Sequence, residues 1–161
     1  MAEESPLPIF TGIPMELCML ENEDEKLGKL PYNAQLVTIE QARESLPEAE
    51  KLLIQLQVMN DEAHHLTEEI EILLENLDPE DEHVVEVADR LASIIKRWQA
   101  TVTSLELTGA RIASLEPGRL EWYGVVDGDI ALYSWMFGEE DIEWYHYTDS
   151  TYLTRKPLIE A

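Results

Sequence analysis

The chain has 161 residues, a hydrophobic content of 45% and a formal net charge of −23 at pH 7. That hydrophobic content excludes wholesale disorder, and the length suits one domain with its own core. The acidic surface would repel nucleic-acid phosphates and anionic membranes, so we expect no direct binding to either. We find neither a basic segment followed by an apolar run at the N-terminus nor any stretch of about 20 apolar residues, and therefore expect a cytoplasmic protein.

Residues 1–36 are expected to form an extended or disordered arm, because they are rich in proline and acid and sustain no helical or strand period. The remainder, 37–161, is expected to be a single domain. It divides into a helical hairpin over 38–109 and a β-meander with a tail over 110–161. Cys18 is the only cysteine, which excludes an intramolecular disulfide and a thiolate zinc site.

The first helical segment begins at Thr38, where the sequence Thr-Ile-Glu-Gln fits a capping box. We expect a short helix at 39–44, a restart around Pro47, which is tolerated in a first turn, and a long helix over 47–76. Apolar residues then recur at spacings of three and four, and a flanking apolar row widens the stripe. Asn60 interrupts this row. A lone polar residue at such a position can fix the register or the oligomeric state of packed helices, and a hydrogen-bonded Asn at the edge of the stripe is an equal alternative.

The second helical segment is predicted over 79–108, with Asp78 as its N-cap, Pro79 in its first turn and Gly109 just after its end. Both long helices would then have 30 residues and be joined by a tight turn. Equal lengths predict an antiparallel, coiled-coil-like hairpin. Because the apolar stripe is wider than a two-helix seam requires, we also expect a homodimer formed by four-helix packing along the distal half.

After Gly109 the apolar pattern changes to the alternation of β-strands. Strands are predicted over 120–126, 130–137 and 142–147, with Asp127-Gly128 as a type I′ turn. The expected fold is therefore α+β: a long antiparallel helical hairpin packed on a small three-stranded antiparallel β-meander.

Motifs along most of the chain are shared with a known family: a Thr-led helix start, a Leu-Pro pair two turns later, an Asp-Gly turn, and a C-terminal series of Trp, Gly-Glu, Ile, aromatic-His, Asp and Arg. They correspond here to Thr38, Leu46-Pro47, Asp127-Gly128, Trp135, Gly138-Glu139, Ile142, Tyr145-His146, Asp149 and Arg155. On these motifs, residues 37–158 resemble a bacterial family of unknown function catalogued as domain of unknown function 2203. The resemblance implies a fold and supplies no reaction.

These C-terminal residues also form the sharpest candidate site. His146 and Glu139 could act as acid and base while Arg155 orients an anionic ligand. The other ligand-binding candidates are Asp149, Trp135 and Tyr145. The alternative is a structural polar cluster in which Arg155 holds the tail by pairing with Glu139 or Asp149, because no nucleophilic side chain accompanies the histidine.

A second cluster lies on the first long helix, where Glu62, His65 and Glu69 have the spacing of side chains that can share a metal ion. Their positions flank the apolar stripe, and the returning helix offers no matching Glu-x-x-His. We therefore expect no metal site and no cofactor.

The distribution of charge suggests the function. Between Lys51 and Arg90 the sequence has 12 acids and no Lys or Arg. We expect a non-enzymatic interaction or adaptor protein with a basic protein partner. The alternatives are a small-ligand-binding protein or enzyme that uses Glu139, His146 and Arg155, and an acidic mimic of nucleic acid.

Overall fold

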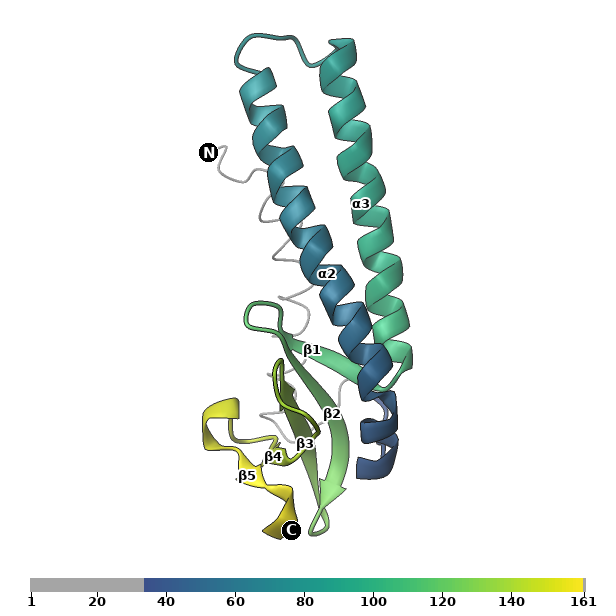
Figure 1. Ribbon diagram of the computed structural model, residues 1–161, viewed down its shortest axis with the longest axis vertical. Coiled ribbons are helices and arrows are strands. Elements are labelled where there is room, and N and C mark those ends of the chain that lie inside the picture. The colour runs from purple at the N-terminus through teal and green to yellow at the C-terminus, as the bar shows by residue number, and fades with distance from the viewer. Residues whose placement is uncertain (1–33, 161) are drawn as a thin grey trace.

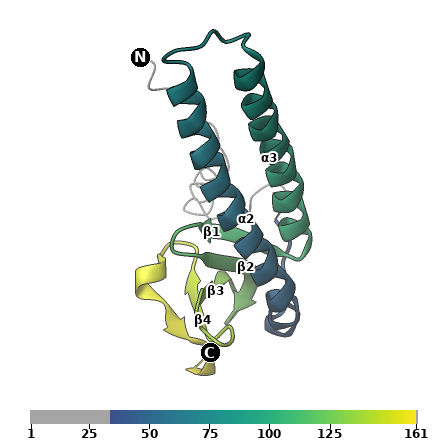
Figure 2. The same cartoon turned by 45° about the horizontal axis from the view of Figure 1, so that its top comes forward.

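The computed structural model describes residues 34–160. The expected arm over 1–36 therefore lies outside the described residues except for its last three positions, and so does Cys18. Two long helices run side by side in opposite directions, and a sheet lies at the end where α2 begins and α3 ends (Figure 1). The connection between the helices lies at the opposite end of the molecule (Figures 1 and 2).

Helix α2 comprises Ile39–Leu73. The capping box is confirmed: Thr38 Oγ1 accepts from the Gln41 amide at 3.0 Å, and Gln41 Oε1 accepts from the Thr38 amide at 2.9 Å. The expected break before Pro47 was wrong, because the helix continues through it. Ala42, Leu46 and Ala49 are all buried, so the packed apolar row continues across the proline. The stability gained by burying this row outweighs the loss of the one backbone hydrogen bond that proline cannot make.

Helix α3 comprises Glu82–Leu107. It begins three residues later than predicted because its N-cap is Asp81, whose carboxylate accepts from the His83 amide at 2.9 Å, and not Asp78. The helices therefore have 35 and 26 residues, not two equal lengths. Gly109, with φ of +96°, follows α3 in the left-handed conformation expected after a helix end.

The sheet is a five-stranded antiparallel meander in the order β1-β2-β3-β4-β5, so the expected three-stranded sheet was wrong. Its strands are β1 (Ala110–Ser114), β2 (Arg119–Val126), β3 (Asp129–Met136), β4 (Trp144–Tyr147) and β5 (Lys156–Pro157). The β2–β3 turn is as predicted, with positive φ at both Asp127 and Gly128. The two strands not predicted are the edges. β1 has a weak apolar pattern, and β5 is only two residues long and includes a proline, which is tolerated at an edge.

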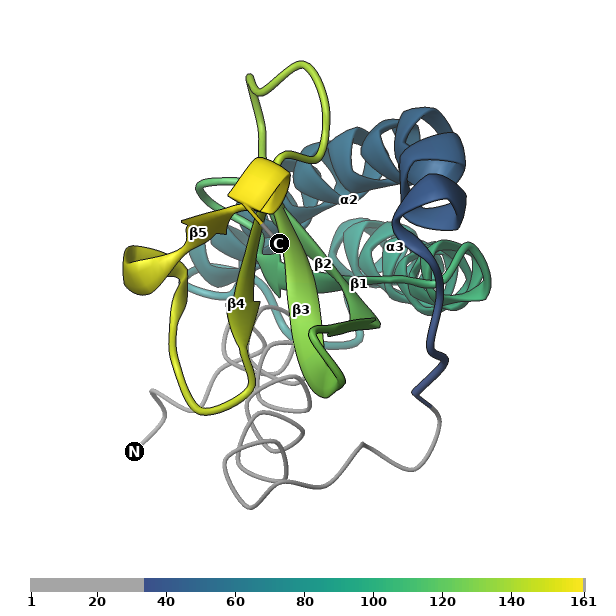
Figure 3. The same ribbon diagram turned by 90° about the horizontal axis from the view of Figure 1, so that it is seen from below.

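The sheet packs one surface against the helices. Seen along the helix axes, β1 and β2 lie next to the helices, and β5 lies furthest from them (Figure 3). Trp122 and Trp135 are both fully buried in one hydrophobic cluster that also contains Leu53 and Leu56 of α2 and Leu105 of α3. The short helices η3 (Tyr152–Thr154) and η4 (Leu158–Glu160) flank β5.

Candidate functional site

The surface of the sheet turned away from the helices carries most of the buried polar side chains among the described residues. Trp122 of β2 points toward α2, because its indole N–H donates to Ser45 Oγ at 2.9 Å. Since side chains alternate along a strand, Glu121 and Tyr123 lie on the other surface. We define the polar face as the side chains on that surface of Arg111, Glu121, Tyr123, Ser134 and His146.

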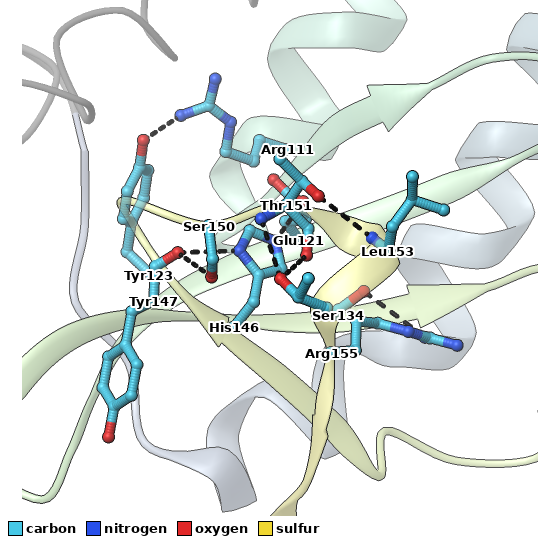
Figure 4. Close-up of polar contacts among 11 residues, drawn as sticks. Arg111, Glu121, Tyr123, Ser134, His146, Tyr147, Ser150, Thr151, Leu153 and Arg155 are labelled. Atoms are coloured by element: carbon cyan, nitrogen blue, oxygen red, sulfur yellow. Dashed lines mark hydrogen bonds and ion pairs between the residues drawn. The ribbon is translucent and has the colours of Figure 1, made fainter.

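Strand register assembles this polar face from three hairpins. Arg111 of β1 pairs with Glu121 of β2, which in turn pairs with Ser134 of β3. In the neighbouring row, Tyr123 pairs with Leu132, which pairs with His146 of β4. Figure 4 shows these side chains gathered on one side of the strands. Residues from four strands thus meet only when the meander is complete.

At its centre, His146 Nε2 lies 3.1 Å from Glu121 Oε2, with both residues buried (Figure 4). His146 Nδ1 lies 2.9 Å from the Tyr147 carbonyl oxygen. A carbonyl can only accept, so Nδ1 carries a proton and donates it. The 3.1 Å contact between Nε2 and the carboxylate is a hydrogen bond when one of the two groups carries a proton at that position.

Arg111 extends the polar face. Its Nη1 donates to the hydroxyl of Tyr123, and its guanidinium carbon lies 5.1 Å from the centre of that ring. Arg111 is only 7% exposed. A buried guanidinium held by an aromatic ring and a hydroxyl keeps a positive charge beside the buried Glu121, its partner in the strand register.

Arg155 anchors the tail on the same surface of the sheet. Its Nη2 and Nη1 donate to the two carboxylate oxygens of Glu139 at 2.9 and 3.3 Å, a bidentate pair. Arg155 Nη1 also lies 3.5 Å from Ser134 Oγ (Figure 4). Glu139 Oε1 in turn accepts from the Met136 amide at 2.9 Å. The pair therefore links the segment after η3 to the loop after β3.

The candidate residues from the sequence are thus divided among four places. Glu139 and Arg155 are brought together, whereas His146 pairs with Glu121. Trp135 and Tyr145 are buried and belong to the hydrophobic cluster on the helix-facing surface of the sheet. Asp149 is exposed.

The aromatic side chains that do surround Arg155 are ones that the sequence did not single out. The guanidinium carbon of Arg155 lies 4.1 Å from the ring centre of Tyr152 and 5.1 Å from that of Trp144. Glu121 and Arg111 were also missed. In the sequence, each is a charged residue that alternates with apolar residues along a strand. A sheet surface exposed to solvent has the same pattern, so only the structure shows that these two side chains are buried.

On α2, the weak metal candidates Glu62, His65 and Glu69 are all exposed. Within residues 34–160, no three His, Cys, Asp or Glu side chains are grouped closely enough to hold a metal ion. A groove lies elsewhere, between the start of α2, the β2–β3 turn and η4. Its lining includes Ile39, Val125 and Leu158, and no side chain of the polar face.

In the part of the chain that the structure describes, neither helix has an apolar stretch of the length and hydropathy needed to cross a bilayer. No curated protein and no solved structure matches the chain. Residues 35–158 match the model of a family described as an uncharacterized conserved protein, DUF2203, as the motifs between Thr38 and Arg155 predicted, and the chain belongs to that family.

Proposed function

We propose that this protein is a non-enzymatic interaction protein whose acidic helical end binds a basic protein partner. The observation that carries the proposal is the placement of charge. The 12 acids between Lys51 and Arg90 occur without any Lys or Arg. Eleven of them are exposed, and the twelfth, Asp81, caps α3. We call the exposed acids of residues 52–89 the acidic band.

The acidic band begins at Asp61, one turn of α2 beyond Gln57, whose side chain contacts the β1–β2 turn, and it extends to the end of the molecule opposite the sheet (Figures 1 and 2). A helix of 35 residues is about 52 Å long. Because charges in solution are screened over about 8–10 Å at physiological salt, the bases near the sheet do not offset the field at the far end of the band. A coiled-coil-like hairpin would serve as a rigid arm that presents this field away from the sheet.

Exposed apolar side chains favour an interface over a surface that is merely kept soluble by charge. Ile72 is 63% exposed, and Leu74 and Val85 are each 43% exposed. All three lie among the acids of the band. Apolar contacts surrounded by charge match the anatomy of protein interfaces, in which buried apolar groups supply affinity and charges supply orientation and rate of encounter.

The pairing of the C-terminal candidates supports a structural role for them. Arg155 is engaged by Glu139, and His146 by Glu121. We propose that these pairs stabilise the sheet, and that replacing Arg155 or His146 lowers stability first. Mimicry of nucleic acid is a narrower form of the same proposal, which requires the partner to be a protein that also binds DNA or RNA.

The test compares three tagged proteins in affinity capture from host lysate, followed by mass spectrometry. The band variant replaces four exposed glutamates of the acidic band by glutamine: Glu68, Glu69, Glu71 and Glu86. The control variant makes the same change of charge near the sheet, at Glu44, Glu116, Glu140 and Glu143. We expect a protein of basic composition to be captured by the wild type and the control and lost from the band variant.

Two results would contradict the proposal. One is the absence of any protein that distinguishes the band variant from the control. The other is a partner whose capture is unchanged by the salt concentration, because binding through exposed charge must weaken as salt rises. Circular dichroism of all three proteins excludes unfolding as the cause of a loss.

A further inference from the structure

We infer that Arg119, Tyr152 and Arg155 form a binding site for the anionic group of a small ligand, a phosphate or a carboxylate. Arg119 is the first residue of β2, and Arg155 follows η3, so the site lies on the sheet and is separate from the acidic band. Two guanidinium groups share one aromatic ring there. The guanidinium carbon of Arg119 lies 4.5 Å from the ring centre of Tyr152, and that of Arg155 lies 4.1 Å from it.

The position of Tyr152 is fixed by its neighbours. Its hydroxyl donates to Met136 Sδ at 3.0 Å and accepts from Arg155 Nη2 at 3.3 Å. The ring therefore holds the two guanidinium groups in defined positions, and a cation–π contact does not use the N–H groups of Arg119 as hydrogen-bond donors.

Charge is incompletely balanced at this site. Arg155 has Glu139 as its bidentate partner. Within residues 34–160, no carboxylate lies within ion-pair distance of Arg119, and none of its N–H groups makes a hydrogen bond to a described residue. Both guanidinium groups contact the Tyr152 ring, so two positive charges share this site with one carboxylate, and an anion bound by Arg119 would offset the second charge.

The chain carries a formal net charge of −23, so most of its surface repels anions, and two arginines that share one aromatic ring are an exception to that pattern. A planar guanidinium with five N–H donors matches the oxygens of phosphate or carboxylate in a bidentate arrangement, which selects those two chemistries. Arg119 is partly exposed, so a small ligand can reach it.

The experiment titrates the full chain, prepared without phosphate, with inorganic phosphate in one arm and succinate in the other, at constant ionic strength. NMR follows the side-chain Nε–Hε signal of Arg119 and the backbone amides around Tyr152. We expect saturable shifts in at least one arm, and the arm with the tighter binding identifies the anion. The Arg119→Gln variant should bind about tenfold or more weakly, because it loses the charge-assisted hydrogen bonds.

The matched control is Arg97→Gln, which removes one exposed positive charge from α3 and should leave the affinity unchanged. Arg119→Lys retains the charge without the planar fork, and we expect an affinity between those of the wild type and Arg119→Gln. No saturable shift in either arm would overturn the inference, as would an equal loss in Arg97→Gln or undiminished binding by Arg119→Gln. The result is independent of the acidic band, so neither proposal depends on the other.

Discussion

Replacing Gly124 by alanine tests the packing of the sheet most sharply. Gly124 lies in the middle of β2 and pairs with Ala131 of β3. A Cβ added at this position would lie 2.5 Å from Cζ and 2.6 Å from the hydroxyl oxygen of Tyr133. Carbon atoms in contact are normally about 3.5–4.0 Å apart, so the ring would have to move by about 1 Å or more.

Tyr133 is 4% exposed and part of the hydrophobic cluster, so a shift of its ring disturbs packed neighbours. Overpacking a core typically costs about 1–3 kcal/mol, whereas alanine in place of a strand glycine would otherwise gain about 0.5–1 kcal/mol. We therefore expect Gly124→Ala to lower the free energy of unfolding by about 1 kcal/mol. For a chain of this size, that corresponds to a fall in Tm of about 2–4 °C.

The assay is urea denaturation followed by circular dichroism, in the wild type and in a Tyr133→Leu background. Leucine lacks the outer ring atoms, so Gly124→Ala should be neutral or stabilising there, with a coupling energy of about 2 kcal/mol between the two sites. An effect of Gly124→Ala below about 0.5 kcal/mol in the wild type, or one of equal size in both backgrounds, would refute this reasoning.

Four further predictions concern stability and assembly. Asn60→Leu should raise the free energy of unfolding in denaturant by about 1 kcal/mol, because the Asn60 side-chain oxygen is buried and has no hydrogen-bond partner among the described residues; a loss of stability would contradict this. Arg155→Ala should lower the free energy of unfolding by about 2 kcal/mol, because it breaks the partly buried bidentate pair with Glu139. Thermal denaturation would show this loss as a lower Tm. Burial raises the pKa of Tyr133 above 10.0, so its contribution to stability is complete below pH 10 and is lost as the pH rises through the folded-state pKa. Urea midpoints measured across the alkaline range should therefore fall less steeply for Tyr133→Phe than for the wild type. The expected homodimer stays a prediction, and light scattering would contradict it by giving the 18.5 kDa of a single chain.

Local signals in the sequence predicted those parts of the fold that local chemistry determines. The capping box at Thr38 and the turn at Asp127-Gly128 each depend on adjacent residues, and both were correct. The helix break at Pro47 was predicted from the same kind of rule, and it failed because buried contacts with distant segments maintain the helix. The edge strands were missed for a related reason. Their pairing is imposed by the neighbouring strand, not by their own composition.

The candidate site was only partly predictable for the same physical reason. The bidentate pair of Glu139 and Arg155 was foreseen as one possibility, because the number of charged residues near the tail limits the choice of partners. The pairing of His146 with Glu121 was not foreseen, because it joins two residues 25 positions apart on strands that are not neighbours and depends on the register of the strand between them. Alternation along a strand assigns side chains to two surfaces of the sheet. It does not say which of these surfaces packs against the helices, and therefore it does not say which side chains form the polar face.

The most direct test of the acidic band is the affinity for the captured basic partner, measured by calorimetry with the band variant and the control variant at two salt concentrations. If each exposed charge contributes about 0.5 kcal/mol, removing four should weaken binding about 30-fold at low salt. That difference should shrink at high salt, and the control variant should bind like the wild type. Equal affinities of the band and control variants at low salt would contradict the account.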